Sequence, residues 1–466
     1  MSKLVNTVLI ILAVLVSCGS PRNNTAGSQA GKQKAALSDE QLLDTIQYLT
    51  FQYFWDGAEP VSGCARERIH MDNVYPEGDQ DVITSGGTGF GLMNIIVGID
   101  RGFITREEGI ARFEQIVDFL GRSDRFHGAW PHWLYGPTGK VKPFSPNDDG
   151  GDIVETAYLV QGLLTVKQFL NPADERENTL AGNISELVNG VEWDWYQRGE
   201  NALTWHWSPR VGWKINFRIG GYNECLIAYI LGASSPTHPL TREAYDEGWA
   251  RNGEISGITE KYGYQLNLLQ RGVKIYDGPL FWAHYSFLGL DPRHLKDQYG
   301  DYWAHNVAQT LIDRAHCIAN PNGYIGYGAN CWGLTASYST GEYHGPAEDS
   351  AAGILIPVGY AAHSPERDYG VISPTAALSS MPYAPEAALE AARHFYFDLG
   401  DKILGPYGFY DAFNETYNWY PKRYLAIDQG PVTVMIENYR TGRLWDLFMK
   451  NTEVTDGLDR LGFTYK

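Results

Sequence analysis

Apolar residues recur at intervals of three and four along most of the chain after residue 37, which is the spacing of one helix face. The segments Ser38–Gln41 and Thr105–Glu108 both have the sequence of a capping box, so each is expected to open a helix. We predict further helices wherever the same spacing returns. The predicted helices cover residues 38–55, 105–120, 152–170, 174–198, 221–231, 259–270, 301–319, 348–361, 385–399 and 431–450.

The sequence has no sustained alternation of apolar and polar residues, which would mark half-buried strands. Long segments rich in Gly, Pro, Trp and Tyr separate the predicted helices at about 122–150, 201–219, 320–346 and 405–428. Loops of this length usually carry function. Because no change of composition divides residues 38–466, we predict one all-α domain built as an (α/α) barrel, a closed ring of helix pairs. An α-solenoid is the alternative, although no fixed repeat supports it.

The first 37 residues have the composition of a targeting signal followed by a tether. Lys3 precedes the apolar run Val8–Val16, which is too short to span a bilayer, and the run ends at Cys18 in the pattern of a bacterial lipobox. We therefore predict a lipoprotein signal peptide over residues 1–18, lipidation of Cys18 and a flexible tether over residues 19–37. This predicts an exported protein of a Gram-negative bacterium, anchored by its lipid in the periplasm or at the outer membrane. A plain secretory signal is the alternative.

Charge and composition narrow the class of ligand. The 37 Lys and Arg against 55 Asp and Glu give a net charge of −18, and no basic stripe appears, which excludes nucleic-acid binding. Aromatic residues make up 13% of the chain and gather in loops, which favours a neutral ligand that stacks on rings. Four cysteines remain besides Cys18, without a CxxC pair, and buried free thiols are as good an expectation as disulfides.

Metal and nucleotide motifs are missing from the sequence. The twelve His residues include no pair at the spacing of metal ligands on one helix, so we expect neither a metal nor a cofactor. The glycine-dense segment Gly86–Gly91 follows no predicted strand and precedes no P-loop Lys. We expect a tight loop there rather than a nucleotide cradle.

Three carboxylates, Asp148, Asp152 and Glu155, gather where an aromatic loop meets a predicted helix. If the helix begins near Asp152, then Asp152 and Glu155 lie on one face. Crowded carboxylates raise one another's pKa, which keeps a carboxylic acid protonated near neutral pH. The same residues would equally serve as a helix cap and as acidic groups at a helix N-terminus, so both interpretations stay open.

Glu224 enters an apolar segment just after the glycine-rich turn Gly220–Asn223, downstream of Trp205, Trp207 and Trp213. A carboxyl in this position is expected to lose its water, which raises its pKa and suits a general acid. The alternative is a solvated Glu in the first turn of a helix.

Near the C-terminus, Asp411 lies in an aromatic loop and can reach a cleft, whereas Asp428 is also a candidate N-cap. Trp130 and Trp133 precede the acidic cluster in another aromatic loop. Aromatic faces stack on sugar rings and carboxylates bind their hydroxyls, while glycoside hydrolysis needs one acid and one base or nucleophile. The residues therefore favour a protein that acts on carbohydrate.

Five segments are characteristic when they are taken together in this order. They are Thr84–Gly91, Asn147–Thr156, Gly221–Cys225, Ala233–Pro239 and Ala426–Pro431. These segments resemble the bacterial glycoamylase-like family and, within it, the β-1,2-glucanases of glycoside hydrolase family 144. The resemblance extends over nearly all of the chain from about residue 38. Some related sequences carry the name glucoamylase, which implies α-1,4 cleavage, and we do not adopt that activity.

The resemblance implies an (α/α)6 barrel, no metal requirement, and an inverting hydrolase of β-1,2-glucan or its oligosaccharides. It implies that Glu224 is the general acid, acting through a substrate hydroxyl, and that Asp411 is the base, with Asp428 in reserve. It also places Asp148, Asp152 and Glu155 in the site. The candidate substrate-binding residues are Trp130, Trp133, Trp205, Trp207, Trp213, Arg218, Tyr343 and Asp428.

The cleavage mode is an expectation from location. A lipoprotein facing the periplasm would meet oligosaccharides short enough to have been imported, which favours exo-type release of sophorose. Endo-type cleavage of long glucan is the alternative. A non-catalytic glycan-binding lipoprotein is an alternative of another class. A polysaccharide lyase is disfavoured because the net charge of −18 comes with no basic pocket for a uronate.

Overall fold

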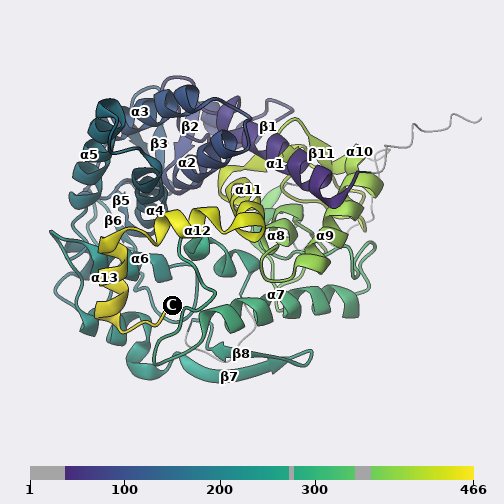
Figure 1. Cartoon of the computed structure of the whole chain (residues 1–466). Helices are drawn as coiled ribbons and strands as arrows, with labels where there is room; N and C mark the ends of the chain where they lie inside the picture. Colours follow the sequence, from purple (N-terminus) through teal and green to yellow (C-terminus); the bar gives the residue numbers. More distant parts are fainter. Residues whose placement is uncertain (1–36, 272–277, 342–357) are drawn as a thin grey trace, which may run out of the picture. The chain divides into compact units, whose positions relative to one another are not determined.

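The computed structural model describes residues 37–271, 278–341 and 358–466, and in this part of the chain six helical segments pack side by side into a ring (Figure 1). The segments are α2 (Ser85–Asp100), α4 (Ile153–Phe169), α6 (Leu226–Ser234), the successive turns η5 (Leu280–Ala283) and η6 (Tyr285–Phe287), α8 (Pro374–Ser379) and α11 (Ala426–Thr441). The ring closes because α2 packs against both α4 and α11, and a 2.9 Å hydrogen bond from His284 to Ser380 joins η6 to the end of α8.

A second layer of helices covers the ring and alternates with it along the chain. Each member contacts a ring segment, and α3, for example, buries a single stripe while its other face is polar. The members are α1 (Asp39–Trp55), α3 (Arg106–Arg122), α5 (Glu175–Asn189), the π-helical turn η3 (Ala244–Trp249), α7 (Tyr302–Ala319) and α9 (Pro385–Arg393). This arrangement confirms the predicted all-α barrel of helix pairs, and both predicted capping boxes are present.

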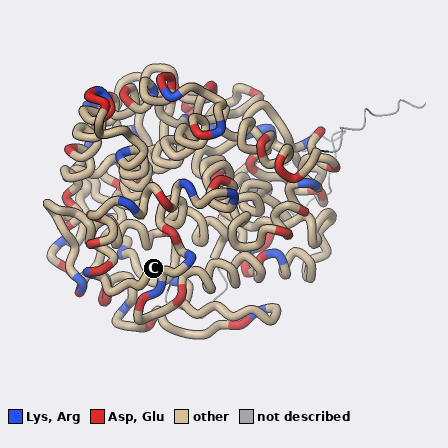
Figure 2. The backbone as a smooth tube through the Cα atoms, viewed as in Figure 1, with Lys and Arg blue, Asp and Glu red and all other residues tan. Residues whose placement is uncertain are grey.

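Short elements complete the fold. The C-terminal helices α12 (Arg443–Phe448) and α13 (Thr452–Leu461) pack against α4 and α6. The remaining helical turns are η1 (Pro76–Asp81), η2 (Trp195–Gln197), η4 (Arg251–Gly253), η7 (His394–Asp398) and α10 (Gly400–Ile403). None of the described helices is long and apolar enough to cross a bilayer. Basic and acidic residues are interspersed over the described backbone (Figure 2).

Small antiparallel sheets lead the chain into several ring helices. Strands β2, β5 and β13 end directly before α2, α4 and α11, so their pairing fixes where those helices begin. The pairs are β1 (Arg68–His70) with β13 (Arg423–Leu425), β2 (Val82–Thr84) with β3 (Trp133–Tyr135) and β4 (Lys140–Lys142), β5 (Gly151–Asp152) with β6 (His206–Trp207), β7 (Ser256–Lys261) with β8 (Tyr264–Leu268), β9 (Ala336–Ser339) with β10 (Gly359–Ala362), and β11 (Leu404–Gly405) with β12 (Gly408–Phe409).

Among the local predictions that were wrong, one concerns a helix and one a loop. The predicted helix 259–270 is the hairpin of β7 and β8, because Tyr262 and Gly263 adopt φ of 52° and 82°, as a tight hairpin turn requires. The predicted loop Gly86–Gly91 is the start of α2. Its glycines permit close helix packing rather than a turn, since a Cβ on Gly89 would lie 2.2 Å from the Tyr158 carbonyl oxygen.

Several predictions concern residues outside the described ranges. The signal peptide, Cys18 and the tether up to residue 36 are among them, as are Tyr343 and residues 348–357 of a predicted helix. The end of that predicted helix, residues 359–361, lies in strand β10. Cys64, Cys225, Cys317 and Cys331 are all buried free thiols, as one of the two expectations held.

Candidate active site

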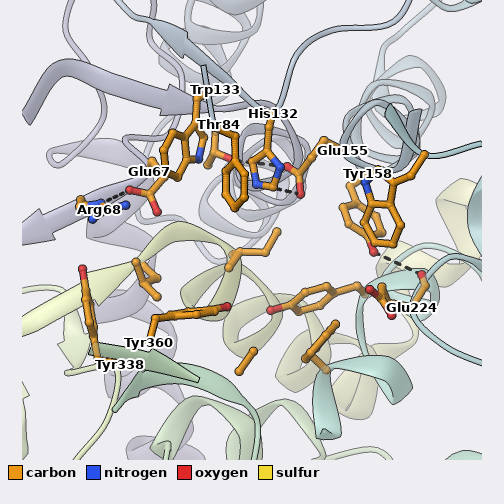
Figure 3. Close-up of a pocket in the computed structure, with 17 residues that line it drawn as sticks. Glu67, Arg68, Thr84, His132, Trp133, Glu155, Tyr158, Glu224, Tyr338 and Tyr360 are labelled. Atoms are coloured by element: carbon orange, nitrogen blue, oxygen red, sulfur yellow. Dashed lines mark hydrogen bonds and ion pairs between the residues drawn. The ribbon is translucent and has the colours of Figure 1, made fainter. Parts of the chain in front are cut away.

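The N-terminal ends of several ring segments surround a cavity of about 380 Å³ (Figure 3). Glu155 lies in the first turn of α4, Ile427 in that of α11, and Glu224 directly before α6. This end of a helix presents unpaired N–H groups and the positive end of its dipole, which favours carboxylates. The lining residues are Glu67, Arg68, Thr84, His132, Trp133, Phe144, Glu155, Tyr158, Trp205, Glu224, Phe281, Tyr285, Ala336, Tyr338, Tyr360, Leu425 and Ile427.

Glu224 reaches the cavity from the turn before α6. Its backbone carbonyl accepts a hydrogen bond from the Tyr158 hydroxyl at 3.3 Å (Figure 3). It accepts another from the Ser286 hydroxyl, and the two bonds together hold the turn in place. Burial raises the pKa of the Glu224 carboxyl to about 7, and the charge of Arg271 opposes the rise only in part. A carboxyl that is still partly protonated at neutral pH can donate a proton to a ligand in the cavity.

Asp152 is the N-cap of α4 and does not line the cavity. One of its oxygens accepts hydrogen bonds from the backbone N–H groups of Val154 at 3.0 Å and Glu155 at 2.9 Å. The other oxygen lies 3.1 Å from Nδ1 of His132. Burial opposes ionisation, but these bonds hold the pKa of Asp152 below its usual range. The helix-cap interpretation therefore describes what Asp152 does in the structure.

Glu155 points into the cavity from the first turn of α4. Its carboxylate accepts a hydrogen bond from the Gly86 N–H at 2.8 Å and lies 3.7 Å from Nε2 of His132. Burial raises the pKa of Glu155, and His132 lowers it in part. Burial also works against a charge on His132, but Glu155 and Asp152 raise the pKa of the imidazole to about 9. His132 is thus a cation held between two carboxylates at the cavity wall.

Asp148 lies behind this wall. Its carboxylate is 3.4 Å from Nε2 of His206, and burial together with the neighbouring Asp152 raises its pKa to about 7. Asp148, Asp152 and His132 offer atoms within 4.8 Å of one another, an arrangement that could hold a metal ion. The His132 cation already supplies positive charge at this place, and one oxygen of Asp152 is occupied in capping α4. Both features compete with binding of a metal ion.

Asp411 and Asp428 form a buried pair of carboxyl groups beneath the opposite wall. One oxygen of Asp411 accepts the Tyr338 N–H at 2.7 Å, and one oxygen of Asp428 accepts the Tyr285 hydroxyl at 3.0 Å. Among the described residues, no donor reaches the second oxygen of either carboxyl, and the two carboxyls interact with each other. A hydrogen bond between them requires that one of them keep its proton.

Burial governs the pKa of both carboxyls, because no neighbouring cation of the described chain pairs with them. Burial raises the pKa of Asp411 to about 7, and burial together with Asp411 raises that of Asp428 well above its usual range. Both shifts favour a pair that keeps at least one proton near neutral pH. The expected N-cap role of Asp428 was wrong, because α11 begins two residues earlier, at Ala426.

The structure brings together only part of the predicted substrate-binding set. Trp133 and Trp205 line the cavity. Trp130 does not, because it is completely buried, with its ring under Arg125 and its Nε1–H donating to the Leu120 carbonyl.

The other predicted residues lie away from the lining. Trp207 and Trp213 both pack around Trp195. The Arg218 side chain is 53% exposed and lies 3.4 Å from Glu200. Asp411 and Asp428 contact the cavity only through Tyr338 and Tyr285.

One charged pair and several aromatic residues of the lining carry no recognisable sequence pattern. Glu67 and Arg68 form an ion pair at one end of the cavity, where burial raises the pKa of Glu67 despite the neighbouring cation (Figure 3). Tyr338 and Tyr360 come from the paired strands β9 and β10. No spacing signal marked these residues, because strand pairing rather than a local motif brings them to the cavity.

Comparisons with known proteins agree with this arrangement. A model of the family Glycoamylase, described as "Putative glucoamylase", matches residues 216–452. The endo-β-1,2-glucanase of Chitinophaga pinensis, solved with sophorotriose and glucose, is 56% identical with a TM-score of 0.87, covering 92% of this chain and 99% of that one. A β-1,2-glucanase of Parabacteroides distasonis is 41% identical with a TM-score of 0.82, covering 92% of this chain and 60% of that one.

The exo β-1,2-glucooligosaccharide sophorohydrolase (non-reducing end) of Parabacteroides distasonis is 43% identical over 442 residues, which is 91% of this chain. The chain spans 58% of the length of that relative. The family model covers just over half of the chain, and the structural matches extend over nearly all of it. The chain therefore belongs to the glycoamylase family, as the resemblance of its five segments predicted.

Proposed function

We propose that this protein hydrolyses β-1,2-glucosidic bonds in β-1,2-glucan and its oligosaccharides. The observation that carries the proposal is the Glu224 carboxyl, held near half protonation by burial in a cavity walled by Trp, Tyr and Phe rings. A general acid working at neutral pH needs this combination, and aromatic walls suit sugar rings. The names of the relatives at 56% and 43% identity, both of which act on β-1,2-linked glucose, support the choice of linkage.

In this mechanism Glu224 donates the proton that the leaving sugar oxygen needs, either directly or through a substrate hydroxyl. Asp411 is the proposed base and is reached through a relay, because its carboxyl lies beneath the cavity wall. The attacking water gives its proton to the Tyr285 hydroxyl, Tyr285 passes its own proton to Asp428, and Asp428 passes its proton to Asp411. His132 and Glu155 hold sugar hydroxyls beside the acid. Water attacks on the face opposite the leaving group, so the anomeric configuration inverts.

The relatives support two different cleavage modes, exo and endo. Exo-type release of sophorose, the mode expected from location, is the activity in the name of the relative of which this chain spans 58%. Endo-type cleavage is in the name of the relative that is 56% identical and matched over 99% of its length. We give the endo mode first place, because that match is the more similar of the two and extends over the whole partner chain.

Export and anchoring belong to the same proposal. Cys18, at the end of an apolar run, is proposed to carry the lipid that holds the protein in the periplasm or at the outer membrane. Growth of the host with labelled palmitate is expected to label the full chain. Absence of label, or label that persists in Cys18→Ser, would overturn the anchor and leave a plain secretory signal.

The test of activity is product analysis with the protein from residue 37 onward. Long β-1,2-glucan and β-1,2-glucooligosaccharides of defined length are the substrates, with laminarin and maltooligosaccharide alongside and Glu224→Gln as the control. A spread of oligomers and an early fall in viscosity supports the endo mode, whereas sophorose from the first minutes supports the exo mode. Glucose released from maltooligosaccharide alone would reject the linkage. Binding without turnover would favour the glycan-binding alternative.

A further inference from the structure

A second cluster of ligand-type side chains lies outside the cavity. Cys331, His394 and Glu415 each offer one ligand atom, and these atoms all lie within 4.8 Å of one another. Cys331 precedes β9, His394 is the first residue of η7, and Glu415 follows Phe413 in the loop after β12. Three segments far apart in the sequence therefore meet at one place, and the proposed reaction uses none of these residues.

The His394 ring is oriented as it is in known metal sites. Its Nδ1–H donates to the Asp398 carboxylate at 2.9 Å, which leaves the lone pair on Nε2. Metal-binding histidines commonly donate their other ring N–H to a carboxylate, which fixes the tautomer and makes the free nitrogen more basic. We therefore take Nε2 as the ligand atom, with Asp398 orienting the ring.

Two glycines, Gly326 and Gly328, lie beside Glu415 and Cys331. A Cβ on Gly326, where φ is +91°, would lie 2.1 Å from a Glu415 carboxylate oxygen, so the absence of a side chain makes room for this carboxylate. Cys331 is only 3% exposed, and reciprocal backbone bonds of 3.1 and 3.3 Å to Gly328 hold it in a tight turn.

Sulfur, imidazole nitrogen and carboxylate oxygen form a donor set that suits Zn²⁺, which often binds three protein ligands and one water. We propose that Cys331, His394 and Glu415 bind one Zn²⁺, with water as the fourth ligand. The cation replaces the thiol proton of Cys331, which is released to solvent. Lys402 is an opposing charge nearby, but its ammonium group is tied to the Tyr420 hydroxyl at 3.0 Å.

Binding of a cation depends on the protonation of the Cys331 thiol. Burial, and then the charge of Glu415, raise the pKa of Cys331. A divalent cation reverses both effects by attracting the thiolate and neutralising the carboxylate. Binding is therefore expected to strengthen as the pH rises.

The place of the site in the fold suggests a structural role. The segment after Cys331 continues into β9, where the Tyr338 N–H binds Asp411, and Glu415 follows Asp411 by four residues. A cation at this place would fasten the two segments that position Asp411. It would not touch the substrate, so the proposal stands or falls separately from the proposed hydrolysis.

The experiment is a titration of the reduced, chelator-treated protein, from residue 37 onward, with Co²⁺ and then with Zn²⁺. One equivalent of Co²⁺ is expected to give a thiolate-to-metal absorption band that one equivalent of Zn²⁺ removes. Calorimetry in buffers of different ionisation enthalpy is expected to register one proton released per Zn²⁺. The midpoint of thermal unfolding is expected to rise when Zn²⁺ is added.

Matched variants locate the cation. Cys331→Ser is expected to abolish the band, and Cys64→Ser, which changes another buried thiol, is expected to leave it intact. Glu415→Gln and His394→Gln each weaken Zn²⁺ at least tenfold, and both remain informative if Cys331→Ser does not fold. A missing band, a band that survives Cys331→Ser, or Zn²⁺ binding lost in His132→Gln but kept in His394→Gln would overturn the proposal.

Discussion

The carboxyl groups on the two walls of the cavity differ in how their environment shifts their pKa values. On the α4 wall, Asp152 and Glu155 sit beside the His132 cation and the N–H groups of helix ends, so Asp152 stays ionised. On the α11 wall, no Lys, Arg or His of the described chain forms an ion pair with Asp411 or Asp428, and burial raises the pKa of both carboxyls.

Glu224 is a third case, because burial is the main cause of its raised pKa. The three environments teach that protonation is set by counter-charge and water rather than by residue type. One wall can therefore anchor hydroxyl groups with fixed charge, while the other wall and the α6 turn exchange protons near neutral pH.

The largest expected effect comes from Glu224→Gln, which removes the isolated carboxyl. Turnover of β-1,2-glucooligosaccharide is expected to fall by about a thousandfold, because general acid catalysis contributes on this order. Binding of sophorotriose, measured by calorimetry, is expected to persist. A fall of less than tenfold would assign the acid to another carboxyl.

The same variant carries a stability signature with a defined sign. The folded pKa of Glu224, about 7, lies above the unfolded value near 4.5, so ionisation of the unfolded chain destabilises the protein as pH rises between them. Glu224→Gln removes that cost. Its melting temperature relative to wild type is expected to be unchanged at pH 4 and higher at pH 8, and an equal difference at both would contradict the assigned burial.

Asp428 is the place where the proposed relay can be tested. In Asp428→Asn the amide can still donate to Asp411 and accept from Tyr285, but it cannot pass a proton between them, so kcat/KM is expected to fall by more than about tenfold. Asp428→Leu removes both contacts as well, so its kcat/KM is expected to fall at least as far. A value within about tenfold of wild type in Asp428→Asn would mean that the proton reaches Asp411 by another route.

On the opposite wall, His132→Gln leaves Asp152 and Glu155 without their cation. The free energy of unfolding is expected to fall by about 2 kcal/mol, less than for a fully buried pair because the ring is partly exposed. The folded pKa of about 9 exceeds the unfolded value near 6.5, so this contribution is complete below pH 6.5 and is lost as pH rises through 9. Urea unfolding at pH 6 and pH 10 measures the difference, which should shrink at the higher pH.

The smallest effect is expected for Arg218→Gln. The side chain is half exposed and pairs only loosely with Glu200, so stability should change by less than about 0.5 kcal/mol. Because Arg218 does not line the cavity, KM should change less than about twofold. A larger rise in KM, measured on β-1,2-glucooligosaccharides, would place Arg218 on the substrate path.

Local rules accounted for much of the fold. The capping boxes at Ser38 and Thr105 and the stripe of α3 were predicted correctly, because an outer helix must show an apolar face and a polar one. The ring helix α2 was missed because an inner helix has no polar face to produce such a stripe. It is buried on all sides and glycine-rich, so it carries no stripe, and its glycines make sense only against the backbone of α4.

The candidate site divides in the same way. Glu155 and Glu224 could be predicted, since each carboxyl stands where a helix begins after an aromatic loop, and the ends of the ring helices converge. Trp130, Trp207 and Trp213 could not be ranked, because burial against Arg125 or Trp195 depends on residues brought in by folding. Glu67 and Tyr338 reach the cavity through strand pairing, which leaves no local spacing to detect.

By itself, the sequence determined the helical class, the family and the chemical types of the site residues, because periodicity, caps and motifs are local properties. The tertiary structure decided which carboxyls face the cavity, which one caps a helix and which two are buried as a pair. Protonation depends on water and on charges contributed by distant segments, such as His132 beside α4 and Tyr338 beside Asp411. Only the folded chain sets those distances.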